Sequence, residues 1–215
     1  MLITMQQLRD KYQIRVTGIV HIGAHLAEEA DAYTQHGVPK VYWIEGNPEL
    51  ISPIQQRLQH FSGQVVIEAL VSDIEGDEAV FHITRDPEGT AMSSSLLELE
   101  VHKVHAPWVK EIGTQLLRTH TLDNICFEHE ITGCNFLNLD IQGAELLALK
   151  GAEHFLETCD YIYTEINTNY LYKDCVLLPE LDAFLAAHGF LRLETNMTPA
   201  EWGDAFYTKK AACQS

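Results

Sequence analysis

The chain has 215 residues, 46% of them apolar and 21% charged, which suits one globular domain with a buried core. Asp and Glu outnumber Lys and Arg by 31 to 14, so the formal net charge is −17. Such a surface repels phosphate backbones and anionic lipids, and no basic run reverses it locally. We therefore expect neither nucleic acid nor a membrane surface as a partner.

Hydropathy and cysteine usage bear on the cellular compartment. The first residues lack the long apolar core of a secretory signal, and no apolar run is long enough to span a bilayer. The five cysteines are odd in number, scattered and without a CxxC pair, as is typical of reduced and mostly buried thiols: Cys126, Cys134, Cys159, Cys175 and Cys213. We expect one cytoplasmic domain over residues 1–215, and the sequence leaves homo-oligomer formation open.

Short apolar runs alternate with helix-like segments along most of the chain, which is typical of a mostly parallel sheet with helices on both faces. The first half predicts a strand over 18–22, a helix over 26–36, a strand over 41–45, a helix over 48–60 and a strand over 65–70. The second half predicts strands over 135–140, 161–166, 190–194 and 205–209, with helices over 144–156 and 179–189.

The middle of the chain interrupts this alternation. Two strands, expected over 78–84 and 116–122, enclose a segment over 86–95 that is rich in Gly, Ser, Thr and Pro. Such a composition is typical of a mobile loop. The sequence therefore predicts an extra β-insertion in the α/β fold.

The spacing of Gly23 and Glu45 points to a cofactor. A glycine directly after the first strand lets the backbone approach a bound molecule closely. Glu45 follows 22 residues later at the tip of the second strand, where a carboxylate can accept hydrogen bonds from both hydroxyls of a ribose. The alternative is a tight turn at Gly23 and a solvated strand end at Glu45.

The residues after Gly23 argue against a dinucleotide. The full fingerprint requires glycines at positions where this chain has His25 and Glu28, and the anions Glu28 and Glu29 would repel a pyrophosphate. S-adenosylmethionine has a ribose and no phosphate, and its sulfonium and ammonium groups suit a carboxylate-rich pocket. We therefore expect this cofactor, with His25 in contact with it. A core or turn position is the alternative for His21 and His25.

A second motif begins at Asp140, which falls at the carboxyl end of a predicted central strand beside the first one. Ligands of open α/β sheets bind at this edge. An N-cap of the following helix would explain an aspartate here. It would not explain the whole string that follows, Gly143-Ala144-Glu145 and then Lys150-Gly151-Ala152.

These motifs resemble the FkbM-type family of S-adenosylmethionine-dependent methyltransferases, whose hallmark is a strand ending in Asp, then Gly-Ala-Glu, a few apolar residues and Lys-Gly-Ala. The resemblance runs from about residue 18 to residue 165. Five further motifs occur in the family's order: Gly23-Ala24; Glu45 with Asn47-Pro48; Val71-Ser72-Asp73 with Gly76; Ser93 to Leu96; and Thr121-Leu122-Asp123. The resemblance implies a Rossmann-like class I methyltransferase with a mostly parallel seven-stranded sheet.

The resemblance also implies which residues bind the cofactor. It brings Ser72 and Asp73, with Val71, against the adenine. The remaining cofactor-binding residues are expected to be His21, Gly23, Ala24, His25, Glu28, Glu45, Asn47 and Asp140. The chain departs from the family at His21, where an acidic residue is usual, at His25, where Asn is usual, and at Ala27, where Gly is usual. Glu28 and Asp140 are then the candidates for holding the methionine ammonium group.

Methyl transfer to a hydroxyl requires an acceptor oxygen positioned behind the methyl carbon and a group that helps to remove its proton. Asp140 is the expected catalytic residue. His102 and His105 are candidates for facing the acceptor, with solvated loop histidines as the alternative. Asp140, Glu165 and Asn167 offer oxygen ligands that suit Mg²⁺ or Mn²⁺. Alternatively, Glu165 and Asn167 only shape the pocket or cap a turn.

Resemblance also indicates the acceptor: a hydroxyl group of a sugar, a glycan or a related small polar metabolite. The sequence thus predicts an O-methyltransferase whose acceptor pocket comes from segments 86–110 and 166–178. Two other classes stay open, a nicotinamide-dependent oxidoreductase and a non-catalytic S-adenosylmethionine-binding scaffold. The missing glycines argue against the first, and the retention of Glu45 and Asp140 argues against the second.

Overall fold

The computed structural model describes residues 1–209, and their main element is a seven-stranded sheet. Its strands are β1 (Ile19–Ile22), β2 (Val41–Glu45), β3 (Gln64–Glu68), β7 (Phe136–Leu139), β8 (Tyr161–Asn167), β9 (Phe190–Met197) and β10 (Trp202–Lys209). They lie in the order β3-β2-β1-β7-β8-β10-β9. The first five run parallel, whereas β10 is antiparallel to both of its neighbours. The strand order reverses between β1 and β7, the point where ligands bind in such sheets.

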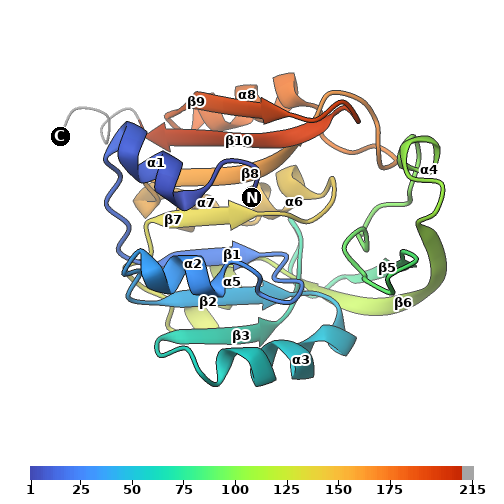
Figure 1. Ribbon diagram of the computed structural model, residues 1–215, viewed down its shortest axis with the longest axis horizontal. Helices are drawn as coiled ribbons and strands as arrows, with labels where there is room; N and C mark the ends of the chain where they lie inside the picture. Colours follow the sequence, from blue (N-terminus) through green and yellow to red (C-terminus); the bar gives the residue numbers. More distant parts are fainter. Residues whose placement is uncertain (210–215) are drawn as a thin grey trace.

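Helices cover both faces of the main sheet, because the central strands β1, β7 and β8 are buried on both sides. One face packs against α1 (Met5–Tyr12), α2 (Ala30–Gln35) and α3 (Pro48–Leu58). The other face packs against α5 (Leu122–Glu128), α6 (Glu145–Lys150), α7 (Glu153–Thr158) and α8 (Leu178–Ala187). The parallel strands all point toward one edge of the molecule in Figure 1.

A small second sheet stands at that edge (Figure 1). It consists of β4 (Leu70–Val71), β5 (Glu78–Arg85) and β6 (Lys110–His120) in the order β4-β6-β5. The long connection from β5 to β6 contains the short helix α4 (His102–His105) and forms a bridge between Leu99 and Tyr172. The predicted β-insertion is thus present, and it lies over the carboxyl ends of the central strands.

The predicted α/β, Rossmann-like fold is confirmed, while several boundaries differ. The helix expected from residue 26 begins at Ala30, because positive φ angles at His25 and Ala27 hold the chain in turns. The single helix expected over 144–156 is divided into α6 and α7 at Gly151. A Cβ there would lie 2.3 Å from the carbonyl oxygen of Ser72, so the chain approaches the turn after β4 very closely. Helix α1 was not predicted; a Thr4 capping box starts it.

Four of the five cysteines lie within the described residues. They are free thiols, buried at Cys134, Cys159 and Cys175 and partly buried at Cys126, whereas Cys213 lies outside the described residues. Among residues 1–209, no helix is long and apolar enough to cross a membrane.

Candidate functional site

Two neighbouring cavities open at the carboxyl ends of β1, β2, β7 and β8. We call them the first and the second chamber. The first chamber lies between the ends of β1 and β2 and the insertion, with Glu45, Val71, Phe81 and Ser95 among its walls. The second chamber lies beside it, with Glu29, His102, Glu165 and Trp202 among its walls. Five residues line both chambers and form their shared wall: Gly23, His25, Met92, Asp140 and Gln142.

Glu45 provides a fixed, buried carboxylate to the first chamber. Its side chain is only 7% exposed. Oε2 accepts a hydrogen bond from the backbone N–H of His25, and Oε1 accepts one from that of Asn47, each at 2.8 Å. Burial raises the pKa of Glu45 even though these hydrogen bonds stabilise the ionised form. Each oxygen keeps a lone pair for a further donor, as a ribose diol would supply.

Gly23 is required by a contact within the protein itself. Its φ angle is +87°, and a Cβ at this position would lie 1.8 Å from the carbonyl oxygen of Asp140. The turn after β1 therefore packs directly on the turn after β7, without room for any side chain. We had expected this glycine to admit a cofactor; the structure gives a second reason, the approach of the two turns.

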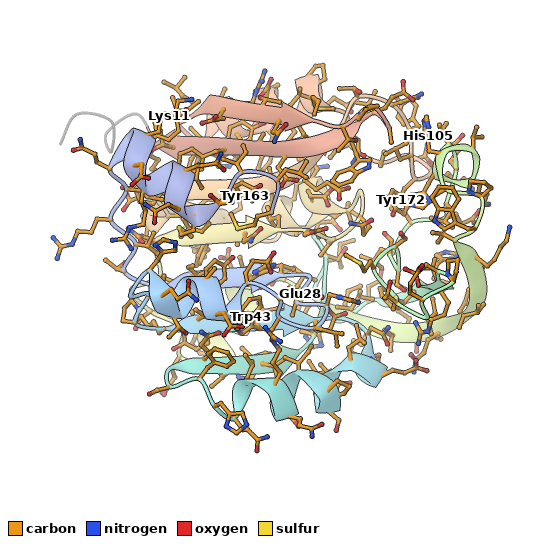
Figure 2. All side chains as sticks on the ribbon, in the orientation of Figure 1. Lys11, Glu28, Trp43, His105, Tyr163 and Tyr172 are labelled. Carbon is orange, nitrogen blue, oxygen red and sulfur yellow. The ribbon has the colours of Figure 1, made fainter. Side chains whose placement is uncertain are left out.

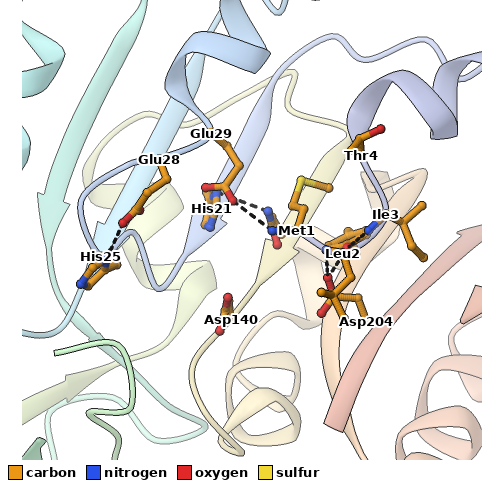
Figure 3. A network of polar contacts seen from close by, with 12 residues as sticks. Met1, Leu2, Ile3, Thr4, His21, His25, Glu28, Glu29, Asp140 and Asp204 are labelled. Atoms are coloured by element: carbon orange, nitrogen blue, oxygen red, sulfur yellow. Dashed lines mark hydrogen bonds and ion pairs between the residues drawn. The ribbon is translucent and has the colours of Figure 1, made fainter. Parts of the chain in front are cut away.

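His25 and Glu28 form an ion pair on the turn after β1, with Nδ1 and Oε1 2.5 Å apart (Figure 3). Desolvation opposes a charged His25, but Glu28 outweighs it and raises the pKa of the imidazole. In turn, His25 holds the pKa of Glu28 below its usual value despite partial burial. Glu28 is thus already paired with a cation within its own turn.

Asp140 and Glu165 are joined by one amide group. The Nε2 of Gln142 donates to Oδ1 of Asp140 at 2.7 Å and to Oε2 of Glu165 at 2.9 Å. The hydroxyl of Tyr172 donates to Oε1 of the same amide at 2.5 Å, which fixes its orientation. Gln142 adopts a left-handed conformation, with φ at +59°, and this turns its side chain toward both acids.

The carboxyl groups near the shared wall are held in a protein-rich environment. The side chain of Asp140 is exposed at the wall of the chambers, but the protein atoms that surround it desolvate the carboxyl group and raise its pKa to about 6. Burial, followed by repulsion from Asp140 and Glu145, raises the pKa of Glu165 well above its usual value. Glu145 is fully buried, and its Oε1 accepts hydrogen bonds from the backbone N–H groups of Ile141 and Gly143. Glu145 therefore fixes the turn that carries Asp140.

The comparisons with known proteins identify the family. Residues 21–192 match the Methyltransferase FkbM domain, a stretch that includes most of the described chain. This protein belongs to the FkbM methyltransferase family. The predicted family is therefore confirmed.

One relative is the 2-O-methyltransferase NoeI of Sinorhizobium fredii (strain NBRC 101917 / NGR234), which is 24% identical over 159 residues. The match covers 72% of this chain, and the chain spans 65% of the length of NoeI. Sequence similarity thus extends over part of that relative and not over its whole length.

Solved structures show the same fold. Magnesium protoporphyrin IX methyltransferase from Synechocystis PCC 6803, with bound SAH, has a TM-score of 0.54 at 9% identity, and the match covers 95% of this chain and 78% of that one. A SAM-dependent methyltransferase from Aquifex aeolicus has a TM-score of 0.51 at 10% identity, covering 96% and 89%. The family match and these structures together show an FkbM methyltransferase domain with a Rossmann-like fold.

His21 replaces the acidic residue usual in FkbM-type proteins, and the structure shows a neutral side chain there. It is 3% exposed and stacks on Trp43 with ring centroids 4.5 Å apart. Its Nδ1 lies 3.2 Å from the hydroxyl of Tyr33 and 3.3 Å from Nδ2 of Asn138. Desolvation lowers the pKa of His21 to about 4, so it is uncharged at neutral pH.

Glu29, which the sequence did not single out as a cofactor contact, supplies a carboxylate next to His21. The amino group of Met1 lies 3.2 Å from its Oε1 (Figure 3). The following residues are fixed as well, because the N–H of Leu2 donates to Asp204 and that of Ile3 to the hydroxyl of Tyr163. This segment borders the second chamber through Met1.

Several predicted residues lie next to the chambers and serve the local structure. Asn47 is buried, and its Oδ1 accepts a hydrogen bond from the N–H of Glu49 at the start of α3. Ser72 donates to Asp73 at 3.1 Å, while Val71 just before them lines the first chamber. Ala24 follows Gly23 and lines the second chamber.

The two loop histidines have different surroundings. His102 lines the second chamber, with Nε2 3.2 Å from the hydroxyl of Ser93, and its buried Nδ1 has no hydrogen-bond partner within the described residues. Desolvation lowers the pKa of His102. His105 pairs instead with Glu201 at 3.0 Å, away from the lining of either chamber. Figure 2 shows His105 on the side of the molecule where α4 lies.

The predicted Mg²⁺ or Mn²⁺ site is not supported. Within residues 1–209, no group of three or more His, Cys, Asp or Glu side chains is arranged to hold a metal ion. Between Asp140 and Glu165 stands the NH₂ of Gln142, a hydrogen-bond donor that a cation would have to displace. Asn167 is fully buried, with both polar side-chain atoms unpaired among the described residues, and it lines neither chamber.

Sequence reasoning named segments 86–110 and 166–178 for the acceptor pocket, and both contribute to the lining of the second chamber, but it did not single out Gln142, Met92, Trp108 or Trp202. Gln142 stands inside the motif that carries the family resemblance, but nothing in its residue type reveals that it bridges two acids. Met92, Trp108 and Trp202 come from the insertion and from β10, and no sequence pattern brings these segments together.

Proposed function

We propose that this protein is an O-methyltransferase that uses S-adenosylmethionine and methylates a hydroxyl group of a sugar, a glycan or a related small polar metabolite. The observation that carries the proposal is the wall shared by the two chambers, with Asp140 at its centre. A cofactor in one chamber and an acceptor in the other would meet there. Positioning of this kind is the main requirement of methyl transfer.

The first chamber suits S-adenosylmethionine, which supplies an electrophilic methyl group when bound. Glu45 offers a buried acceptor for the ribose hydroxyls, and Val71, Phe81 and Ile141 offer an apolar wall for the adenine. The acidic surroundings suit a cofactor that carries a sulfonium ion. They would repel the pyrophosphate of a nicotinamide dinucleotide.

The second chamber suits a small polar acceptor. Its volume of about 390 Å³ lies within the range typical of ligand sites. Asp140 faces this chamber with a pKa of about 6, so its carboxylate is ionised at neutral pH and still basic enough to accept the proton of a hydroxyl group. His102 lines the opposite side as a further polar contact for the acceptor.

Calorimetry with S-adenosylmethionine, S-adenosylhomocysteine and NAD⁺ tests the cofactor, and radiolabelled methyl transfer to a panel of glycosides tests the reaction. We expect the first two molecules to bind and NAD⁺ not to bind. Tight NAD⁺ binding would favour an oxidoreductase. Cofactor binding without transfer to any acceptor would favour a scaffold. The net charge of −17 agrees with a small-molecule acceptor and disfavours nucleic acid as a partner. The cytoplasmic location and the oligomeric state stay predictions.

A further inference from the structure

The charged side chains that line the second chamber are mostly acidic. Five carboxylate side chains line it, those of Glu28, Glu29, Asp86, Asp140 and Glu165. Within residues 1–209, no Lys or Arg side chain lines it. Four of the five acids line the second chamber alone, and only Asp140 also faces the first. Of these acids, Glu28 and Asp140 are also the candidates for holding the methionine ammonium group of the cofactor, whereas Glu29, Asp86 and Glu165 are not.

Among the described residues, Asp140 and Glu165 have no cationic side chain as a partner. Asp140 and Glu165 both accept a hydrogen bond from the neutral amide of Gln142. Desolvation, followed by repulsion from Asp204 and Glu29, raises the pKa of Asp140, and desolvation, followed by repulsion from Asp140 and Glu145, raises that of Glu165, so the two ionised carboxylates are unfavourable as they stand. A bound cation relieves such a situation, whereas a bound anion makes it worse. Glu28, by contrast, already has His25.

Glu29 already has a positively charged neighbour. The amino group of Met1 lies on Glu29, and this pair borders the same chamber (Figure 3). When the amino group of Met1 is counted, the lining of the chamber still has an excess of negative charge. Asp86 and Glu165 have no cationic partner among the described residues.

Aromatic side chains provide an independent observation. Trp108, Tyr172 and Trp202 line the same chamber, and Trp108 is 57% exposed. Tyr172 is fully buried, so Trp108 offers the most accessible ring, and aromatic side chains are common in the walls of ligand pockets. Aromatic faces attract cations and pack against the apolar faces of sugar rings. Carboxylates combined with aromatic rings thus match a polar ring compound that carries a positive charge.

We propose that the acceptor is an amino sugar or a closely similar amino alcohol, whose ammonium group is held by Glu165 and whose neighbouring hydroxyl is methylated. This inference rests on the proposed O-methyltransferase function. The charged ammonium has no lone pair and stays unmethylated. The hydroxyl oxygen forms the bond to the methyl carbon, the carbon–sulfur bond breaks with its electron pair left on sulfur, and the hydroxyl proton passes to Asp140.

The test compares acceptors on the same sugar ring that differ in charge: the methyl glycoside of a 2-amino-2-deoxyhexose, its N-acetyl derivative, the parent neutral hexoside and the corresponding uronic acid. We expect kcat/KM for the amino compound to exceed that for the N-acetyl compound by about tenfold, the scale of one charged hydrogen bond. Glu165→Gln should remove this preference. Glu153→Gln, an exposed acid on α7 that pairs with His188, should keep it.

Binding of the same four compounds to the protein saturated with S-adenosylhomocysteine gives a readout that does not require turnover. Equal or tighter binding of the N-acetyl compound or the uronic acid overturns the inference, and so does a methyl group found on nitrogen by NMR of the product. A protein that methylates neutral and amino sugars equally keeps the proposed function and loses only this inference. A protein that does not bind S-adenosylmethionine loses the proposed function itself.

Discussion

The two chambers are built from different parts of the chain. The first is formed by the ends of β1, β2 and β4 and the turn after β7, where short-range motifs fix the backbone, and by Phe81 and the stretch around 91–96 of the insertion. The second takes its walls from the turn after β1, the insertion, the segment after β8 and the start of β10, which are distant in sequence. The shape of the first chamber, the proposed cofactor side, therefore depends largely on local sequence motifs. The shape of the second chamber, the proposed acceptor side, depends on the tertiary packing of segments that are distant in sequence.

Asp140 belongs to both chambers, so its substitution should have the largest effect. Asp140→Asn keeps the shape of the side chain and removes its charge. We expect turnover to fall at least ~100-fold, the lower end of a general-base effect, while S-adenosylmethionine still binds. Steady-state kinetics and calorimetry on the folded variant measure both quantities.

Asp10→Asn on the exposed face of α1 is the matched control and should behave like the parent protein. If Asp140→Asn turns over like the parent protein, Asp140 has a structural role alone, and the shared wall is not the place of methyl transfer.

Glu45 belongs to the first chamber alone, so its substitution should separate the two sides. Glu45→Ala removes the ribose acceptor and should weaken S-adenosylmethionine binding by roughly 1–3 kcal/mol, the scale of a hydrogen bond to a charged group. The preference among acceptors should stay unchanged. Glu68→Ala is the control, because Glu68 lies directly opposite Glu45 on β3 and is exposed. Unchanged cofactor affinity in calorimetry would remove Glu45 from the site.

The pH dependence of the reaction tests whether Asp140, in the shared wall, acts as the general base. Asp140 has a raised pKa of about 6 and must be ionised to accept a proton. The kcat/KM value should therefore fall about tenfold for each pH unit below 6 and level off above it. A rate profile in saturating S-adenosylmethionine measures this. A profile that is flat between pH 5 and pH 7 would exclude Asp140 as the base.

The smallest expected effect is a change of mobility over 86–105. The first chamber has a volume of only about 60 Å³, below the range of about 300–1,000 Å³ typical of ligand sites, and Ala91, Met92 and Ser94 form part of its wall. This segment should therefore move outward to admit the cofactor and then close. Hydrogen exchange there should slow when S-adenosylhomocysteine and an acceptor are added. Equal exchange in both states would argue against a lid.

The sequence predicted the first chamber well because its residues follow strand ends. A glycine after β1, an acid after β2 and an aspartate after β7 are placed by the parallel sheet, and the structure brings Gly23, Glu45 and Asp140 to one edge. The periodicity of the sequence locates each strand, and the carboxyl ends of parallel strands then lie at the same edge of the sheet.

The second chamber could not be predicted to the same extent. The bridge made by Gln142 depends on a left-handed backbone and on the hydroxyl of Tyr172, 30 residues away. Trp108 and Trp202 meet only through tertiary packing. The break between α6 and α7 likewise arises from a contact of Gly151 with a distant turn, which no helical pattern reveals.

The contact of Gly23 with the Asp140 carbonyl limits how this protein and its relatives can diversify. A side chain at position 23 would displace the backbone that carries the Asp140 carboxylate, whatever residue stands at position 140, so position 23 is restricted to glycine. Asp86, Trp108 and Trp202 border the second chamber without touching that contact. Substitutions at these three positions can therefore change the acceptor specificity stepwise while the turns that carry Gly23 and Asp140 stay intact. One half of the site can vary during evolution, and the other half is held constant.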